Sequence, residues 1–189
     1  MPFADELSSD GVVVVPYQPR WHAEGAELGD KLRRWVPGAS AVEHIGSTSI
    51  PGMAAKDCLD MMIVVDDPDS ASSSEGLLAA GFRIRSESWN LSENAGGRAW
   101  PKRVFAPPVG ERRSNIHLRP TDSESARLAL LFRDHLRASP QRVVDWSEFK
   151  TRIAQHTDDL ASYGQIKLPA WRLLMELAEI WAQQTRWRV

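Results

Sequence analysis

The chain has 189 residues, of which 42% are apolar and 25% are charged, as in an ordinary soluble protein. Its formal net charge of −2 gives no electrostatic case for binding nucleic acid or an anionic membrane, because such binding normally requires a basic patch. The one cysteine, Cys58, excludes an internal disulfide and a cysteine-based zinc cluster.

We expect no signal in this chain that would send it to or through a membrane. No apolar run approaches the length of a transmembrane helix, and residues 1–6 lack the basic and apolar regions of a signal peptide. We therefore expect a cytoplasmic protein with a frayed N-terminus at residues 1–10. Residues 11–189 are expected to form a single domain, with a helical C-terminal part at residues 121–188, since no linker separates two folding units.

The first third of the chain alternates short apolar runs with one helical pattern. The predicted order is strand, helix, strand and strand, at residues 12–15, 21–35, 41–45 and 58–65. The first strand is a run of four valines stopped by Pro16. The helix shows apolar residues at helical spacing and ends at Pro37 and Gly38.

The middle of the chain is less regular. Residues 72–80 predict a short helix closed by Gly81, and residues 82–85 a short strand. Residues 86–99 are rich in Asn, Ser and Gly and form the longest irregular stretch, of the kind that often serves as a functional lid. Two more strands are predicted at residues 102–106 and 115–119.

Beyond Pro120 the pattern is helical to the end. Thr121 and Glu124 have the spacing of a capping box at the start of the first of these helices. Ser139 with Pro140 predicts the start of the next, and Pro169 the start of the last. The apolar face expected for the last helix is Leu173, Leu174, Leu177, Ile180 and Trp181. We expect the strands to form one mixed sheet on which these helices pack, which is an α+β fold.

The loop between the strands at 41–45 and 58–65 is the strongest candidate for a site. Gly46, Ser47, Thr48, Ser49 and Lys56 combine a glycine that lets the backbone come close with groups that donate hydrogen bonds to phosphate. A carboxylate nearby can hold a metal ion. The alternative is a plain strand–turn–strand connection, and the spacing alone leaves both open.

Asp60 stands in a strand that is apolar on both faces. A strand of that kind is normally central and buried on both sides. A carboxylate there must be paired, hydrogen-bonded or bound to a metal, and a structural salt bridge is the alternative to a functional role. Asp57 points away from Asp60, so these two cannot form one metal-binding pair.

Two histidines are further candidates. His117 shares a strand face with Asn115 and Arg119, and beside a carboxylate it would suit proton transfer or metal ligation. His44 leads directly into the Gly-Ser loop. Each histidine taken alone is more often a structural residue than a ligand. The chain has no Walker loop, dinucleotide fingerprint, His-Glu-x-x-His motif or nucleophile elbow.

One segment resembles the signature of a known family. Residues 43–56 read Glu-His-Ile-Gly-Ser-Thr-Ser-Ile-Pro-Gly-Met-Ala-Ala-Lys, close to the GrpB pattern Glu-His-[Ile/Val]-Gly-Ser-Thr-[Ser/Ala]-Val-Pro-Gly-Leu-Ala-Ala-Lys. Other segments resemble the family in the same order: residues 14–17 with Trp21, residues 103–105, 115–118 and 132–140, and Tyr163 with Lys167. The resemblance covers residues 12–185.

This resemblance implies the nucleotidyltransferase fold superfamily, with a mixed sheet and flanking helices. In that superfamily a Gly-Ser turn holds a triphosphate, and carboxylates on later strands hold two magnesium ions. It also implies a link to dephospho-CoA kinase, to which GrpB domains are fused and for which they are described as folding accessory domains. Gly46, Ser47 and Asp60 fit the superfamily site. Met62 stands where the second carboxylate should be, and a thioether is a poor magnesium ligand. The third acid is replaced by His117.

Two hypotheses follow. The first, which we favour, is an enzyme that uses a nucleotide and transfers a nucleotidyl group with an altered centre. Asp60 and His117 would be catalytic, Asp60 would bind magnesium delivered with the nucleotide, and the loop residues named above would hold phosphates. Additional cleft residues would be Glu43, His44, Arg103 and Asn115. The second is a catalytically reduced module that binds a nucleotide, a CoA-like phosphate or a partner protein without turnover.

Overall fold

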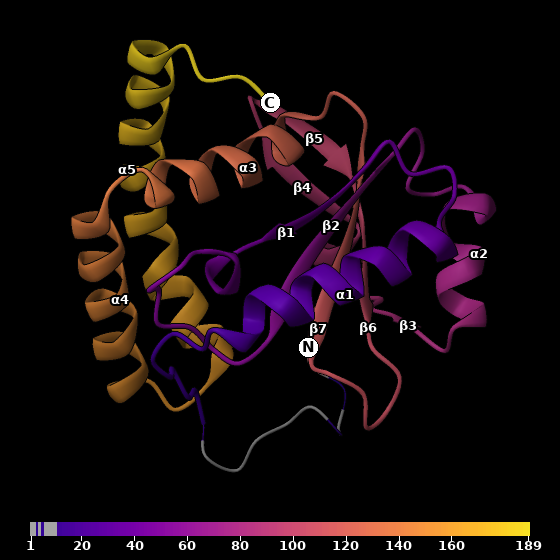
Figure 1. The fold of residues 1–189 in the computed structure, drawn as a ribbon, viewed down its shortest axis with the longest axis horizontal. Coiled ribbons are helices and arrows are strands. Elements are labelled where there is room, and N and C mark those ends of the chain that lie inside the picture. Colours follow the sequence, from indigo (N-terminus) through magenta and orange to yellow (C-terminus); the bar gives the residue numbers. More distant parts are fainter. Residues whose placement is uncertain (1–2, 4, 6–10) are drawn as a thin grey trace.

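The computed structural model describes residues 3, 5 and 11–189, so the frayed segment expected at residues 1–10 falls mostly outside the described residues (Figure 1). The α-helices are α1 (Arg20–Trp35), α2 (Ala71–Ala79), α3 (Glu124–Arg137), α4 (Pro140–Gln155) and α5 (Leu160–Thr185). The strands are β1 (Ala41–Ile45), β2 (Leu59–Val65), β3 (Arg83–Ile84), β4 (Ser92–Ala95), β5 (Arg98–Pro101), β6 (Arg103–Ala106) and β7 (Ser114–Pro120). Within residues 11–189, the short 3-10 helices are η2 (Ser47–Ser49) and η3 (Ser88–Asn90).

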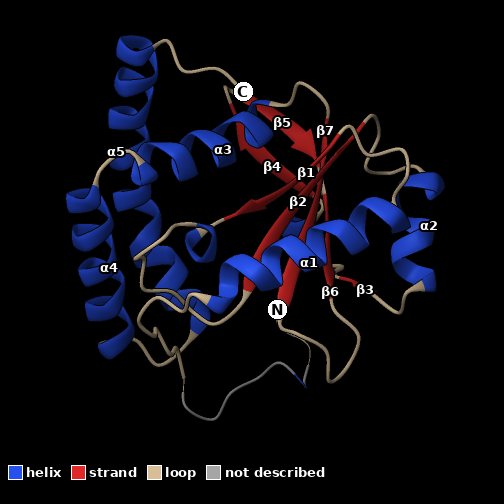
Figure 2. Cartoon of the chain, in the orientation of Figure 1, coloured by secondary structure: helices blue, strands red, loops and turns tan. Residues whose placement is uncertain are grey.

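Five strands pair into one mixed sheet in the order β1-β2-β7-β6-β3 (Figure 2). β2 and β7 run parallel, whereas the other neighbours run antiparallel. β2 lies between two partners and is buried along most of its length, as its two apolar faces predicted. The expected α+β fold with a mixed sheet, flanking helices and a helical C-terminal third is confirmed.

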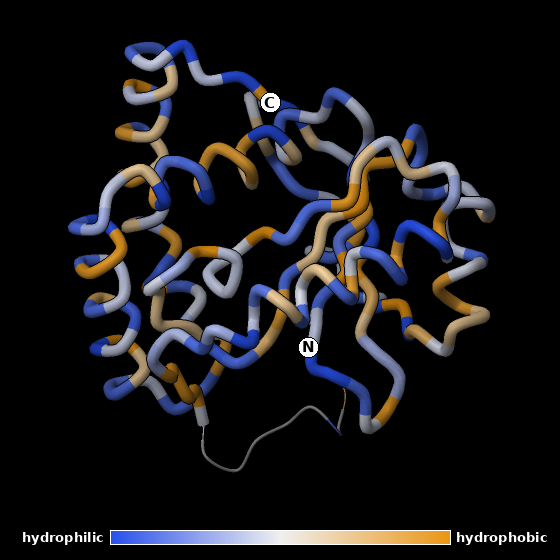
Figure 3. The backbone as a smooth tube through the Cα atoms, viewed as in Figure 1, coloured by the Kyte–Doolittle hydropathy of each residue, from blue (hydrophilic) through white to orange (hydrophobic). Residues whose placement is uncertain are grey.

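One face of the sheet is closed by α1 and α2. Leu32 of α1 and Leu77 of α2 pack with Met61, Ile63 and Leu118 in one core cluster. Figure 3 shows hydrophobic residues gathered along these central strands. The polar side chains of β2 and β7 therefore point to the other face of the sheet.

The other face carries α3, with α4 and α5 beyond it (Figure 1). Ile45 of β1 and Met62 of β2 pack against Ala126 and Leu130 of α3. The loop after β1 reaches the two last helices, because Met53 is buried in a cluster that α3, α4 and α5 all supply. This face of the sheet, the loop and the C-terminal helices enclose the candidate site.

The strand predicted at residues 12–15 does not form. Val15 makes one isolated bridge with Ala55 and joins no sheet. Val12 is instead buried against Ile153 and Tyr163 of the late helices. The apolar run gains its burial from helix packing, so no strand partner is needed.

The long irregular stretch expected at residues 86–99 is largely structured. β4 and β5 form an antiparallel hairpin that turns at Gly96 and Gly97. Both glycines have positive φ, of 59° and 74°, as a two-residue hairpin turn demands. The pair of glycines between two short runs was a local hairpin signal that outweighs the polar composition.

Two predicted helix starts are wrong. Ser123, and not Thr121, caps α3, since its side chain accepts the N–H of Ala126. Thr121 instead donates to the carbonyl of Val65 and so ties β7 to the end of β2. Ser139 caps α4 as predicted.

The last helix begins nine residues before Pro169, which lies inside α5. Asp159 caps it by accepting the N–H groups of Ala161 and Ser162. The apolar face predicted from residues 173–181 is also wrong in part: Leu173, Leu177 and Ile180 are exposed. The inward residues include Tyr163, Met175, Ala178 and Ala182.

Candidate functional site

The site begins where β1 ends in a turn beside Asp60. Ile45 pairs with Asp60 across the antiparallel ladder, and Gly46 follows with φ 67° and ψ −170°, a conformation open to glycine. A Cβ on Gly46 would lie 2.5 Å from Oδ2 of Asp60. Glycine thus lets the loop approach the carboxylate.

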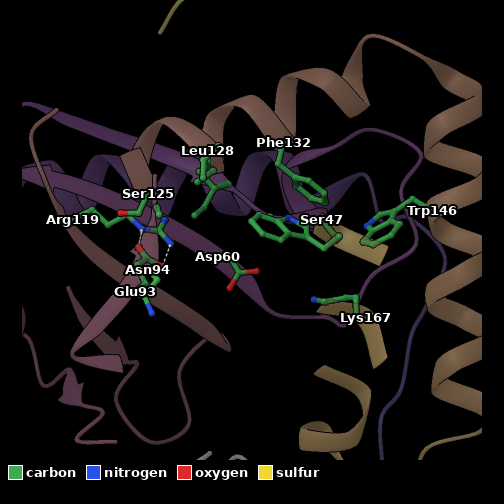
Figure 4. Close-up of a pocket in the computed structure, with 15 residues that line it drawn as sticks. Ser47, Asp60, Glu93, Asn94, Arg119, Ser125, Leu128, Phe132, Trp146 and Lys167 are labelled. Carbon is green, nitrogen blue, oxygen red and sulfur yellow. Dashed lines mark hydrogen bonds and ion pairs between the residues drawn. The ribbon is translucent and has the colours of Figure 1, made fainter. Parts of the chain in front are cut away.

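A cavity of about 250 Å³ lies between this turn and the C-terminal helices (Figure 4). Ser47, Asp60 and Lys167 line its polar side. Its remaining wall is mostly apolar and aromatic, and the β4–β5 hairpin reaches it with Glu93 and Asn94. Three segments distant in the sequence therefore meet here.

Asp60 is held as a carboxylate by β7. Its Oδ1 accepts a hydrogen bond of 2.9 Å from Asn115 Nδ2, and His117 Nε2 lies 3.6 Å from the same oxygen. Desolvation raises the pKa of Asp60, but His117, Asn115 and the charge of Lys56 outweigh it and lower the pKa to about 2. Asp60 is ionised at neutral pH.

His117 is neutral by the same logic. Desolvation lowers its pKa, more than the neighbouring Asp60 carboxylate raises it. Its Nδ1 is buried and has no hydrogen-bond partner among the residues that the structure describes. The pairing of β2 with β7 therefore brings Asp60, Asn115 and His117 together on one sheet face. The alternation alone predicts only that Asn115 and His117 share a face of their own strand.

A buried lysine supports the Gly-Ser loop from α4. Lys150 is 2% exposed, and its Nζ donates to Oγ of Ser47 at 2.9 Å and to the carbonyl of Ala54. Burial lowers its pKa to about 7, and the charges of Lys167 and Lys56 add to the effect. Sequence reasoning missed this residue, although it stands at helical spacing between Trp146 and Ile153 on the inward face.

Two more lysines flank Tyr163. Lys56 Nζ lies 5.7 Å and Lys167 Nζ 5.6 Å from the centre of its ring. Desolvation and the charge of Lys56 lower the pKa of Lys167. Lys56, Lys150 and Lys167 thus place positive charge near the single Asp60 carboxylate.

The remaining loop hydroxyls take part in the loop's own structure. Thr48 is buried, and its Oγ1 lies 2.9 Å from His44 Nε2. Ser49 donates to the carbonyl of Gly46 at 2.7 Å. Of the three hydroxyls, the one that lines the cavity belongs to Ser47.

His44 lies on the opposite sheet face from Asp60 and packs against Gly25 of α1. A Cβ added to Gly25 would come within 2.3 Å of Nδ1 of His44. Burial lowers the pKa of His44 to about 4, so the ring is neutral. The structure therefore places His44 behind the loop and not in the cavity.

Two other predicted cleft residues are engaged elsewhere. Glu43 pairs with Arg133 of α3 at 2.7 Å, and Arg133 also donates to the carbonyl of His44. Arg103 pairs with Asp69 at 2.7 Å, outside the cavity lining. Asp57 faces away from Asp60, as expected, and accepts the indole N–H of Trp21 at 2.7 Å.

A guanidinium lies beside Met62, which stands where the second metal-binding carboxylate was expected. Arg119 Nη1 is 3.4 Å from the sulfur of Met62, and Arg119 is also paired with Glu93 at 2.5 Å and 3.1 Å. Lys102 Nζ lies 3.3 Å from Glu93 as well. Desolvation raises the pKa of Glu93, but Arg119 and Lys102 lower it to about 2. The hairpin thus brings a carboxylate into the cavity wall, already neutralised by its own partners.

The donor set does not fit a two-metal centre. Within residues 3, 5 and 11–189, no group of three or more His, Cys, Asp or Glu side chains is arranged to hold a metal ion. Of the two carboxylates in the cavity lining, Glu93 is already paired with Arg119 and Lys102, which leaves Asp60 to offer oxygens to magnesium beside substrate phosphates and water. Over the same residues, no helix combines the length and apolar character needed to cross a membrane.

Comparison with known proteins identifies a family. The GrpB family profile, described as GrpB protein, matches residues 11–176. The crystal structure of conserved protein GrpB from Enterococcus faecalis is similar, with a TM-score of 0.71 and 24% identity, over 93% of this chain and 100% of that chain. Cid1 poly(U) polymerase with MgGTP gives a TM-score of 0.49 and 15% identity, over 76% of this chain and 43% of that chain.

A curated relative is the dephospho-CoA kinase of Mycolicibacterium paratuberculosis. It is 31% identical over 213 residues, which include 100% of this chain and 52% of the relative. Other curated kinases of the same name, from Mycobacterium bovis and Mycobacterium tuberculosis, match in the same proportion. The chain spans about half the length of these relatives.

Proposed function

This chain belongs to the GrpB family, and we propose that its cleft binds the phosphates of a nucleotide. The contact between Lys150 and Ser47 carries the proposal. Where Lys150 is protonated, at and below about pH 7, its ammonium has donors only, so Ser47 Oγ accepts and its hydroxyl hydrogen is left to donate elsewhere. Because Ser47 lines the cavity, that hydrogen is available to a phosphate oxygen.

The charge around the cleft favours an anion over a free cation. Lys56, Lys150 and Lys167 lie close enough for their charges to depress the pKa values of the two that are buried most deeply. A polyphosphate would relieve this repulsion, whereas a free magnesium ion would add to it. We expect magnesium to enter as a nucleotide complex, with Asp60 as its protein ligand.

The reaction class that the site supports best is nucleotidyl transfer. An acceptor oxygen would form a bond to the α-phosphorus while the bond to the pyrophosphate leaving group breaks. The acceptor proton needs a base, and neutral His117 is the candidate to receive it by way of Asp60, because Asp60 lines the cavity and His117 lies outside that lining, 3.6 Å from Oδ1 of Asp60.

A second candidate is binding without turnover, as a module that holds a nucleotide or CoA-like phosphate, or a partner protein. Met62 and Arg119 in place of a second carboxylate favour it, because one carboxylate cannot hold two magnesium ions. This chain matches about half the length of a dephospho-CoA kinase, and this supports a link to CoA.

Binding is tested by calorimetry and thermal shift with ATP, GTP, CTP and UTP, each with and without magnesium. Ser47→Ala should weaken binding by about 1–3 kcal/mol, and it should also lower the unfolding temperature, because buried Lys150 loses an acceptor; binding is therefore compared at a temperature where both chains are folded. Ser74→Ala, half-buried on α2 and outside the cavity lining, is the matched control and should bind as the wild type. No response to any nucleotide would overturn the proposal.

Turnover is measured separately, as pyrophosphate released from the bound nucleotide in the presence of magnesium. Release that is lost in Asp60→Asn supports transfer. Binding with no release, over the range of nucleotides that bind, supports the second candidate.

A further inference from the structure

The cavity has an apolar half that phosphate binding does not use. It is lined by Leu128, Phe132, Trp146 and Trp171, which come from all three C-terminal helices (Figure 4). Leu128, Phe132 and Trp171 are only partly buried, although each is large and apolar. An apolar surface of this kind, continuous with a charged site, is suited to the uncharged part of the same ligand.

The two halves are linked along one face of α5. Tyr163, Lys167 and Trp171 follow each other at intervals of four residues, so they lie on one helix face about 6 Å apart along the axis. Lys167 lies on the phosphate side and Trp171 on the apolar side. The base of a nucleotide is separated from its phosphates by one ribose, so a nucleotide can span the two positions.

The aromatic wall of the cavity, formed by Phe132, Trp146 and Trp171, is held in place by contacts between aromatic rings. Phe132 meets Trp146 edge-on, with ring centres 6.0 Å apart, and lies 6.3 Å from Trp171. Trp146 is in turn stacked on Phe149 at 5.1 Å. A ring fixed by such contacts loses little freedom when a ligand stacks on it.

We propose that this half of the cavity binds the aromatic base of the ligand, with Trp171 as the main stacking residue. The ligand is then a nucleoside polyphosphate, and not an inorganic polyphosphate or a sugar phosphate. This inference rests on the proposed function, since it gives a binding place to the base, which is the part of the nucleotide that the phosphate site does not contact. Stacking tolerates every base, so we expect the four common nucleotides to bind within about tenfold of one another.

The test compares ATP with inorganic tripolyphosphate, by calorimetry on the whole chain. The wild type should bind ATP about 10-fold to 100-fold more tightly, which is the worth of one base stacked on an aromatic ring. Trp171→Leu keeps an apolar helix residue and should bring ATP down to the affinity of tripolyphosphate, while tripolyphosphate binding changes less than about twofold. Trp181→Leu, on the same helix and outside the cavity lining, is the matched control and should retain the preference.

The outcomes separate this inference from the function on which it rests. Equal affinity of the wild type for ATP and tripolyphosphate overturns the base site and leaves the phosphate site standing. Binding of neither overturns both. If Trp171→Leu does not fold, Phe132→Leu replaces it, and a full preference for ATP in a folded Phe132→Leu chain counts against the aromatic wall.

Discussion

Lys150 Nζ lies 2.9 Å from the hydroxyl oxygen of Ser47, which is 103 residues earlier in the chain. The same ammonium group donates to the carbonyl of Ala54. Ser147, almost one turn earlier on α4, accepts the N–H of Ala54 at 3.0 Å. One face of a single helix therefore fixes both ends of the loop at residues 47–54.

Lys150→Met should change how stability depends on pH. Burial lowers the pKa of Lys150 from its ordinary value of 10.5 to about 7. Between these pH values the unfolded chain binds a proton that the native chain does not, so this group makes the free energy of unfolding rise with pH. The variant lacks that contribution.

We expect wild-type stability relative to Lys150→Met to increase by roughly 1–3 kcal/mol from pH 7 to pH 9. Urea unfolding at both pH values measures it. Lys31→Met, on an exposed turn of α1, is the control and should run parallel to the wild type. If the free energy of unfolding changes equally between pH 7 and pH 9 in Lys150→Met and in the wild type, Lys150 stays protonated in the native state.

Gly46→Ala should destabilise the fold more than Gly97→Ala. Both glycines have positive φ, which costs any other residue about 1–2 kcal/mol. A Cβ on Gly46 would meet Asp60 at 2.5 Å, whereas on Gly97 it meets no atom within 4 Å. We expect Gly46→Ala to lose roughly 1–3 kcal/mol more than Gly97→Ala in chemical denaturation. Equal losses would show that the turn moves freely away from Asp60.

Met62→Asp tests the reduced metal centre. The new carboxylate would share a strand face with Asp60 in a fully buried position, so we expect a loss of roughly 2–4 kcal/mol without metal. Magnesium alone should raise the unfolding temperature of Met62→Asp, because two carboxylates can share a cation. Met62→Asn, of similar size and uncharged, should gain nothing from magnesium. A clear rise in the wild type would contradict the single-carboxylate site.

A fragment that ends at Pro120 should not fold cooperatively. It would leave Ile45 and Met62 without α3, and the Gly-Ser loop without Lys150. We expect an insoluble or molten chain, recognised by loss of near-ultraviolet circular dichroism with retained secondary structure. A sharp thermal transition in this fragment would instead divide the chain into two folding units.

The strongest features of the fold could be predicted because they are local. β2 reads as a central strand from its two apolar faces, and Asp60 and the Gly-Ser turn stand out on it because their residue types are unusual there. Their meeting in space follows from the antiparallel pairing of β1 with β2. The register of β2 with β7 then adds Asn115 and His117 to the same face.

The rest of the site depends on contacts that no local pattern carries. Lys150 is one lysine among many helix residues, and only the packing of α4 on the loop gives it a role. Glu93 reaches the cavity because the Gly96-Gly97 turn makes a hairpin, whose polar composition resembles a loop. The predicted start of α5 is wrong because proline is common at the first position of a helix, which pointed to Pro169. In the structure Asp159 caps the helix and Pro169 lies inside it.

The two-ended fixation of the loop by α4 has a thermodynamic consequence. A loop free to move must be ordered when a ligand arrives, and the lost conformational entropy is subtracted from the affinity. Here the ordering is complete once α4 has packed, so it belongs to folding and not to binding. The amide hydrogen of Ala54, which donates to Ser147 of α4, should then exchange with solvent only when the C-terminal helices open, at a rate that a ligand slows together with exchange in α4.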